Sequence, residues 1–108
     1  MEGRNLTQLR SLSRSAFGQT YRLEVMLAIA DSPDGLVTQT DLAQQLGVSV
    51  SNVQGPVSSL VACGLLAEMP RGDSRSRYLL RNRSAAWEWA REMRATVVEA
   101  GSVRPRTR

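Results

Sequence analysis

The sequence contains no histidine and no lysine, and its single cysteine is Cys63. Without histidine there is no imidazole base, and one cysteine supplies neither an internal disulfide nor the clustered ligands of a soft-metal site. A phosphate-binding glycine loop followed by lysine is excluded as well. We expect Cys63 to be a small buried core residue. The sequence therefore predicts no enzyme, no catalytic residue, no metal site and no cofactor.

Long apolar runs are also missing. No stretch reaches the ~20 apolar residues that a membrane-spanning helix needs, and the N-terminus lacks the apolar region of a signal peptide. We therefore expect a cytoplasmic protein with no membrane contact. The 108 residues, 42% of them hydrophobic, are enough to bury one core. This predicts a single domain over residues 1–100, followed by a disordered basic tail over residues 101–108.

The segment Thr38 to Leu66 has the pattern of two short helices joined by a tight turn. Thr38 and Asp41 have the spacing of a capping box at the start of the first helix. Gly47 stands where a helix ends in a left-handed residue, and Ser49 is placed to cap the second helix. This spacing predicts a helix-turn-helix.

The second helix of this motif has an apolar side and a polar side. Val53, Val57 and Leu60 fall on one face at spacings of four and three, which leaves small and polar residues on the opposite face. Such a face can enter a DNA major groove closely and offer hydroxyl and amide groups to base edges. The predicted DNA contacts in this motif are Thr38, Gln39, Thr40, Ser49, Ser51, Asn52, Gln54, Gly55 and Ser58.

Pro56 lies inside the second helix, where proline removes a backbone hydrogen bond and costs about 3 kcal/mol in a regular helix. One interpretation is a kink at Pro56. The other is a later helix start, with Ser51 as cap and Gln54 closing a capping box, which brings Pro56 nearer the first turn. The sequence leaves both open.

Residues 65–69 and 76–81 are typical of two strands around a turn. Tyr78 and Leu80 fall on one side of the second strand and are expected to pack against the helices, so that Arg77 points the other way. The alternative to DNA contact is an exposed hairpin whose arginines only keep it soluble. The predicted DNA contacts in the hairpin are Arg71, Arg75 and Arg77.

Two helices and a short strand are expected before the helix-turn-helix. Residues 6–17 follow a helical period that Gly18 breaks. Thr20 is placed to cap a second helix over residues 21–30, which is apolar on nearly every side and must therefore be buried. Residues 36–37 are expected to form the strand.

The last predicted helix, over residues 84–100, spreads apolar side chains over roughly half of its circumference. A helix that packs on the surface of one domain needs a narrower apolar face than this. We therefore predict a two-fold dimer in which the terminal helices of two copies bury these side chains. The alternative is that both tryptophans lie on their own core. The predicted dimer interface consists of Leu6, Leu9, Phe17, Trp87, Trp89, Met93 and Val97.

Charge is distributed unevenly along the chain. Residues 1–22 carry a net charge of +3, residues 23–70 carry −5 with no basic residue, and residues 71–108 carry +6. The helix-turn-helix is therefore acidic. The attraction to phosphate that dominates non-specific DNA affinity must come from the hairpin and the two ends of the chain.

These motifs together resemble winged helix-turn-helix transcription regulators, most closely the ArsR-like and MarR-like bacterial repressors. The likeness runs from about Tyr21 to Leu80 and includes DLAQQLGVS, SNVQGPVSSLVACGLL and RGDSRSRYLL. It implies a mainly α fold with a small β-hairpin wing (α+β), and dimerisation through the terminal helices as in ArsR-like proteins. Metal-sensing ArsR proteins usually carry clustered Cys or His ligands, which this sequence lacks.

The function that the resemblance implies is a dimeric repressor that binds double-stranded DNA sequence-specifically. Its recognition helix would enter the major groove and its arginine-rich wing would lie on the backbone. The alternative is a winged-helix interaction module that binds another protein and not DNA. The operator and the effector, a small molecule or a protein, are left open.

Overall fold

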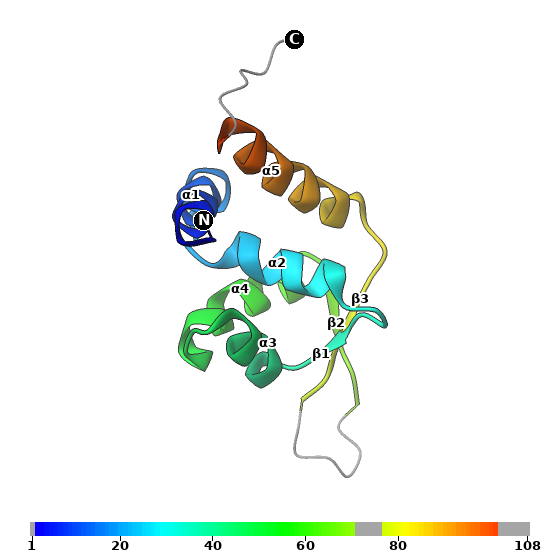
Figure 1. Cartoon of the computed structure of the whole chain (residues 1–108). Helices are drawn as coiled ribbons and strands as arrows, with labels where there is room; N and C mark the ends of the chain where they lie inside the picture. Colours follow the sequence, from blue (N-terminus) through cyan, green and yellow to red (C-terminus); the bar gives the residue numbers. More distant parts are fainter. Residues whose placement is uncertain (1, 71–76, 102–108) are drawn as a thin grey trace.

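The computed structural model describes the backbone of residues 2–70 and 77–101, and the side chains of residues 6–70 and 77–97. Within these ranges the chain forms five helices and a small antiparallel sheet, the mainly α winged-helix fold that the sequence predicts (Figure 1). The elements in chain order are α1 (Glu2–Phe17), α2 (Arg22–Asp31), β1 (Leu36–Val37), α3 (Gln39–Leu46), α4 (Val50–Ala62), β2 (Leu66–Glu68), β3 (Leu79–Arg81) and α5 (Ala85–Gly101).

Helix α2 is the centre of the fold. It packs against α3 and α4 on one side and against α1 and α5 on the other, so that the terminal helices and the helix-turn-helix occupy opposite sides of the molecule (Figure 1). Every residue from Leu23 to Ala30 is buried. A helix that is apolar on nearly every side is thus surrounded on every side, as the sequence predicts.

The connection between α1 and α2 confirms one prediction and corrects another. Gly18 ends α1 with a φ of +75°, but Thr20 does not cap α2: the N-cap is Tyr21, which makes no side-chain cap bond. The first turn is capped instead from α1, because the Leu23 N–H donates to the Ser13 hydroxyl at 3.1 Å, and that hydroxyl donates to the Gln19 carbonyl. Ser13 is fully buried. A cap supplied by a neighbouring helix leaves no signal in the local sequence.

Two of the described charged side chains, one between α1 and α2 and one in an exposed loop, have shifted pKa values. A hydrogen bond from Arg10 Nε to buried Glu24 Oε1, at 2.7 Å, raises the pKa of Arg10 and ties α1 to α2. In the loop after α2, the backbone N–H of Leu36 donates to the Asp34 carboxylate at 3.1 Å and lowers the pKa of Asp34. A carboxyl group with a lowered pKa stabilises the fold above its ordinary pKa, and this stabilisation is lost as the pH falls through the lowered value.

The helix-turn-helix starts and turns where the sequence predicts. Thr38 Oγ1 accepts the Asp41 N–H at 3.0 Å, and Gly47 ends α3 with a φ of +71°. Ser49 occupies the N-cap position of α4 but makes no cap bond; its hydroxyl lies 2.9 Å from that of Ser51. Because α4 begins at Val50, the later start with Ser51 as cap is wrong.

Helix α4 runs unbroken through Pro56 to Ala62, and the proline ring is buried. Since proline has no N–H, the carbonyl of Asn52 lacks its usual partner four residues on. Burial of the ring against the core offsets part of that loss. Gly64 follows the helix with a φ of +82° and starts the turn into β2.

The sheet has the strand order β1-β3-β2, with Val37 and Glu68 both opposite Leu79. The predicted facing of the last strand is wrong by one residue: Leu79 is buried at 1% exposure, Leu80 is half-buried, and Tyr78 is 39% exposed. Three apolar residues in a row carry no alternation, so the pattern alone fits either face. The predicted turn, with Arg71 and Arg75, lies outside the described residues.

Three members of the predicted dimer interface pack within their own chain. Trp87, Met93 and Val97 are buried within the single chain at 5%, 6% and 6% exposure, and Trp87 Nε1 donates to the Asn82 carbonyl at 2.7 Å. They therefore have almost no surface left for a second copy. Trp89 is 46% exposed and meets the Phe17 ring edge-to-face at a centroid distance of 5.5 Å. Trp87 thus lies on its own core, whereas a dimer contact of Trp89 stays a prediction.

Cys63 is exposed at the end of α4, so the prediction of a buried core cysteine is wrong. The helix ends one residue earlier, and the turn carries Cys63 away from the core. The predicted tail over residues 101–108 lies outside the described residues except for Gly101, which ends α5. None of the described helices is long and apolar enough to cross a membrane.

Candidate nucleic-acid interface

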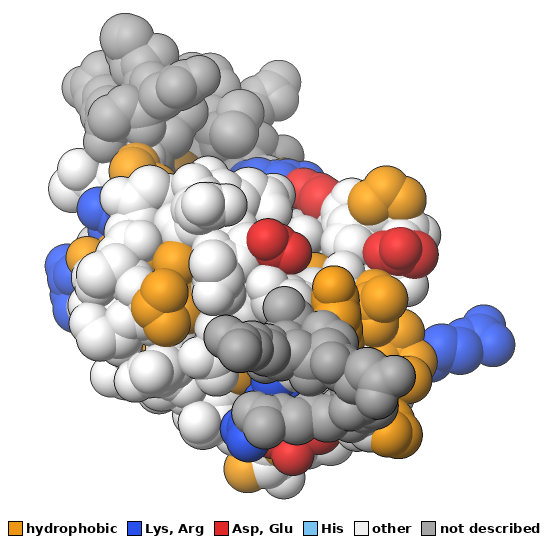
Figure 2. Space-filling view, turned by 90° about the horizontal axis from the view of Figure 1, so that it is seen from below, with side chains coloured by type: hydrophobic (Ala, Val, Ile, Leu, Met, Phe, Trp, Pro, Cys, Tyr) orange, Lys and Arg blue, Asp and Glu red, His pale blue; other side chains and the backbone are white. Residues whose placement is uncertain are grey.

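The outward face of α4 consists of uncharged polar side chains over a buried apolar face. Val53, Val57 and Leu60 are at most 2% exposed. Figure 2 views the underside of the molecule, formed by the helix-turn-helix and the hairpin, and most of this surface is uncharged polar side chain and backbone. The structure places the following predicted contacts on the exposed side of α4 and its cap: Ser49, Ser51, Asn52, Gln54, Gly55 and Ser58.

The start of α3 contributes less than the sequence predicts. Thr38 is only 8% exposed, and its hydroxyl is the cap of α3, so it positions the helix and presents little surface to a ligand. Gln39 is half-buried and Thr40 is exposed. Of the three residues predicted at this helix end, Gln39 and Thr40 therefore remain at the surface.

Gly55 lies on a different flank of α4 from the groove beside the hairpin. A Cβ atom added at Gly55 would come 3.5 Å from Nε2 of Gln19, and the same Gln19 amide donates to the Ser59 hydroxyl at 3.3 Å. This distance is an ordinary van der Waals contact, so a methyl group would fit at Gly55, and the packing of α4 against the connection between α1 and α2 does not itself require glycine.

A groove of about 220 Å³ separates α4 from the hairpin. It brings together three predicted DNA contacts from three elements, Gln39, Ser58 and Arg77, beside Glu68, which sequence reasoning missed. Arg77 reaches the groove because it lies two residues before Leu79, on the same side of the strand. The remaining residues that line the groove are Val57, Val61, Ala62 and Leu79.

Arg77 carries the positive charge among the described residues that line this groove, since the other two predicted hairpin contacts lie outside the described residues. Its guanidinium Nη1 lies 3.7 Å from Glu68 Oε2 in an ion pair. The side chains of Arg77 and Glu68 are 56% and 54% exposed. Both groups are therefore open to solvent and to a ligand entering the groove.

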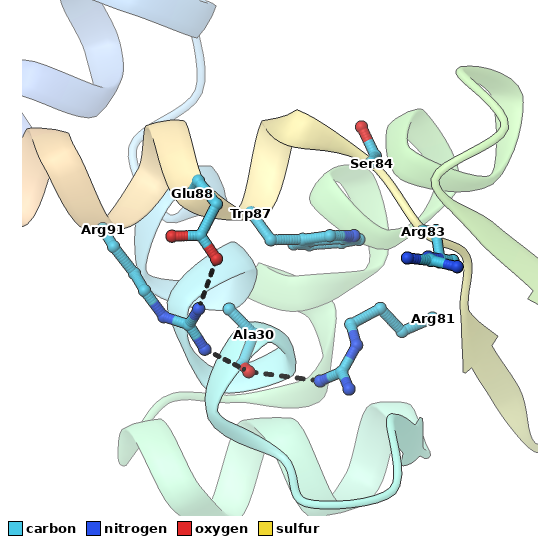
Figure 3. Close-up of a pocket in the computed structure, with 7 residues that line it drawn as sticks. All are labelled: Ala30, Arg81, Arg83, Ser84, Trp87, Glu88 and Arg91. Carbon is cyan, nitrogen blue, oxygen red and sulfur yellow. Dashed lines mark hydrogen bonds and ion pairs between the residues drawn. The ribbon is translucent and has the colours of Figure 1, made fainter.

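A second hollow, of about 250 Å³, lies between the end of α2 and the start of α5. Figure 3 shows Arg81 and Arg91 converging on the Ala30 carbonyl from opposite sides, below the ring of Trp87. Arg81 Nη1 donates to the carbonyls of Ile29 at 2.7 Å and Ala30 at 3.1 Å, and Arg91 Nη2 donates to Ala30 at 2.7 Å. Cations suit the last carbonyls of a helix, because its C-terminus is electronegative.

Three arginines line this second hollow, and Glu88 is the acidic side chain among its lining residues. Glu88 pairs with Arg91 at 2.8 Å, whereas Arg83 is exposed and makes no hydrogen bond or ion pair with the described residues. The hollow therefore has a net positive charge and an aromatic wall. Sequence reasoning missed it, because its arginines come from separate elements. No group of His, Cys, Asp or Glu suited to a metal ion occurs among residues whose side chains are described.

The geometry can be compared with known structures. The transcriptional regulator BldR from Sulfolobus solfataricus superposes with a TM-score of 0.71 at 14% identity, over 94% of this chain and 74% of that one. A MarR-family regulator from Silicibacter pomeroyi gives 0.70 at 21% identity, over 92% and 67%. NadR in complex with 4-hydroxyphenylacetate gives 0.58 at 23% identity, over 94% and 70%. These likenesses establish the fold.

The sequence itself matches the MarR family over residues 22–76, just over half of the chain, which runs from the start of α2 into the hairpin. Among curated proteins, none matches it significantly. The MarR-like resemblance predicted above is thereby confirmed, while the ArsR-like resemblance stays a prediction. The chain belongs to the MarR family, whose members are transcriptional regulators rather than enzymes.

Proposed function

We propose that this chain is a dimeric repressor that binds double-stranded DNA sequence-specifically, with α4 in the major groove and the hairpin on the backbone. One observation carries the proposal: helix α4 buries Val53, Val57 and Leu60 and exposes a mostly uncharged, polar face next to a groove that holds an arginine. Hydroxyl and amide groups on a projecting helix suit base edges, which offer hydrogen-bond donors and acceptors.

The dimensions of α4 fit this role. Its 13 residues span about 20 Å, and its outward side chains are short enough for the helix to enter a major groove about 12 Å wide. Ser51, Asn52 and Gln54 lie in the first two turns, the part of a recognition helix that contacts bases. Side-chain amides pair best with adenine through its N6 and N7 atoms.

A dimer is the second part of the proposal, and its interface is revised to the surface around Trp89. This surface contains Trp89, which is 46% exposed, and half-buried Phe17, whose ring meets that of Trp89. Leu6 and Leu9, elsewhere on α1, are the other predicted members that keep some exposed surface. An exposed tryptophan is costly in water and typical of interface centres. The terminal helices lie on the opposite side of α2 from α4, so a second copy bound there leaves both recognition helices open (Figure 1).

The alternative, a winged-helix interaction module without DNA binding, rests on the acidic net charge of residues 23–70. A mobility-shift titration with a random-sequence duplex separates the two proposals. We expect binding at about 50 mM salt that weakens steeply by about 200 mM, because phosphate contacts release counterions. Absence of binding at low salt would contradict the DNA proposal and leave the interaction module.

We further propose the hollow below Trp87 as the site of a small-molecule effector that carries a negative charge. The arginine-rich lining and the Trp87 wall suit a flat organic anion, and NadR, which shares the fold, is named as a complex with 4-hydroxyphenylacetate. The volume of about 250 Å³ limits the ligand to a small molecule. Because Arg81 comes from β3 and Ala30 from α2, a ligand here contacts both the hairpin and the central helix.

The test uses Trp87 as a fluorescent reporter in a Trp89→Phe variant, which leaves one tryptophan in the chain. We expect 4-hydroxyphenylacetate to change Trp87 emission saturably and the neutral amide of the same acid to fail. Arg83→Gln should weaken binding about tenfold or more, since it removes a charged hydrogen-bond donor. Arg94→Gln, one turn beyond Arg91 and outside the lining, is the matched control and should bind as the parent does. Equal responses to acid and amide would refute the site.

A further inference from the structure

Glu68 and Arg77 are brought together by the register of the hairpin. Glu68 is directly opposite Leu79, and Arg77 lies two residues before Leu79, so the pair is a diagonal one on a single face of the ribbon. That face turns toward α4, because Leu79 is buried at 1% exposure. The ion pair of 3.7 Å therefore lies inside the groove that also holds Ser58 and Gln39.

The hairpin does not depend on this ion pair for its shape. The Met69 N–H donates to the Tyr78 carbonyl at 2.9 Å, and β2 pairs with β3 through backbone hydrogen bonds over its whole length. An ion pair whose two groups are both more than half exposed contributes little to stability. The stability of the hairpin therefore does not explain why the acidic side chain of Glu68 lies beside Arg77 on a surface that suits DNA.

We infer that Glu68 lowers the affinity for DNA, because it pairs with Arg77 in the groove and competes with DNA phosphate for it. The inference rests on the proposed DNA-binding function and adds a regulator of its affinity. In the free protein the Arg77 guanidinium pairs with the Glu68 carboxylate. When a DNA phosphate binds that guanidinium, the carboxylate loses its partner.

This competition changes both affinity and its dependence on salt. Each phosphate that a cation neutralises contributes roughly 0.9 to the slope of log K against log salt on duplex DNA. When Arg77 leaves Glu68, the freed carboxylate takes up a cation, and this uptake offsets part of the counterion release. Without the carboxylate, binding should be tighter at low salt and should fall more steeply as salt rises.

The experiment compares the full chain with Glu68→Gln, which keeps the size and hydrogen-bonding capacity of the side chain while removing its charge. We expect Glu68→Gln to bind a random duplex about two- to fivefold more tightly at low salt and to steepen the salt slope by up to about one unit. The matched control is Glu92→Gln, which removes an exposed carboxylate on α5 outside both hollows and lowers the negative charge equally. It should bind as the wild type does.

A double variant distinguishes action through Arg77 from general repulsion of phosphate. In an Arg77→Gln background, Glu68→Gln should have no further effect on the affinity or on the salt slope. The guanidinium for which the carboxylate and the phosphate compete is then absent. If Glu68→Gln still tightens binding there, or if Glu92→Gln tightens it equally, the inference is overturned in favour of simple net charge. Weaker binding by Glu68→Gln would overturn it too, as the carboxylate would then contact DNA itself. If the wild type binds no duplex, the failure lies with the proposed function.

Discussion

Replacing Trp87 by alanine is expected to lower the free energy of unfolding by about 3–5 kcal/mol, the usual cost of removing a large aromatic side chain from a core. Trp87 is 5% exposed, packs within the main core cluster and satisfies the Asn82 carbonyl at 2.7 Å through its indole N–H. The loss therefore combines a cavity with an unpaired carbonyl. Urea denaturation followed by far-ultraviolet circular dichroism would measure it.

Trp89 is the matched control, because it is the same residue type two positions along the same helix but is 46% exposed. Trp89→Ala should cost the isolated chain far less, on the order of 1 kcal/mol from its contact with Phe17. It should instead shift the protein toward monomer in light scattering. A dimer that survives Trp89→Ala with unchanged affinity would contradict the proposed interface, and equal destabilisation by both variants would contradict the assignment of Trp87 to the core.

The second large effect is expected for Gln54→Ala, which should lose about 1–3 kcal/mol of binding free energy on the cognate operator. Gln54 is exposed in the second turn of α4, carries no charge and has no hydrogen bond to a described residue. Its amide is therefore free to pair with a base. The operator would first be selected from a random pool, and wild type and variant would then be titrated on it and on a scrambled duplex at several salt concentrations.

The comparison variant is Arg77→Gln. It should weaken binding about equally on both duplexes and flatten the salt slope by up to about one unit, as expected for a phosphate contact. Gln54→Ala should leave the scrambled duplex and the slope unchanged. If Arg77→Gln alone abolishes the preference for the operator while Gln54→Ala binds both duplexes normally, then the hairpin reads bases and α4 does not.

The helix-turn-helix could be predicted from the sequence because its signals are local. Thr38 caps α3 by accepting the N–H of Asp41, three residues further on. Gly47 adopts the left-handed conformation that glycine takes readily at a helix end. The apolar spacing of Val53, Val57 and Leu60 identifies the buried face without knowledge of any partner. Local geometry of this kind depends on a few neighbouring residues.

The predictions that failed share a physical cause, because each concerns a feature that is determined by tertiary contacts rather than by neighbouring residues. The sequence could not tell which of the two tryptophans meets the core, because each fits an apolar stripe that covers half a helix. Leu79 is buried rather than Tyr78 because β3 sits between β1 and β2 under α4, and three consecutive apolar residues contain no alternation to reveal this. Glu68 joined the candidate site only once the strand register placed it beside Arg77.

The hydroxyl of Ser13 on α1 accepts the N–H of Leu23 at the start of α2, and this contact suggests an order in which the helices fold. Helix α2 has no side-chain cap of its own, and its Leu23 N–H finds a partner only after α1 has docked. The two residues are ten positions apart, so this closure is fast and precedes the long-range contacts of α2 with α5. During synthesis α1 leaves the ribosome first and is ready to cap α2 as it emerges. The pair α1–α2 is thus the expected nucleus, onto which the helix-turn-helix and the last helix assemble.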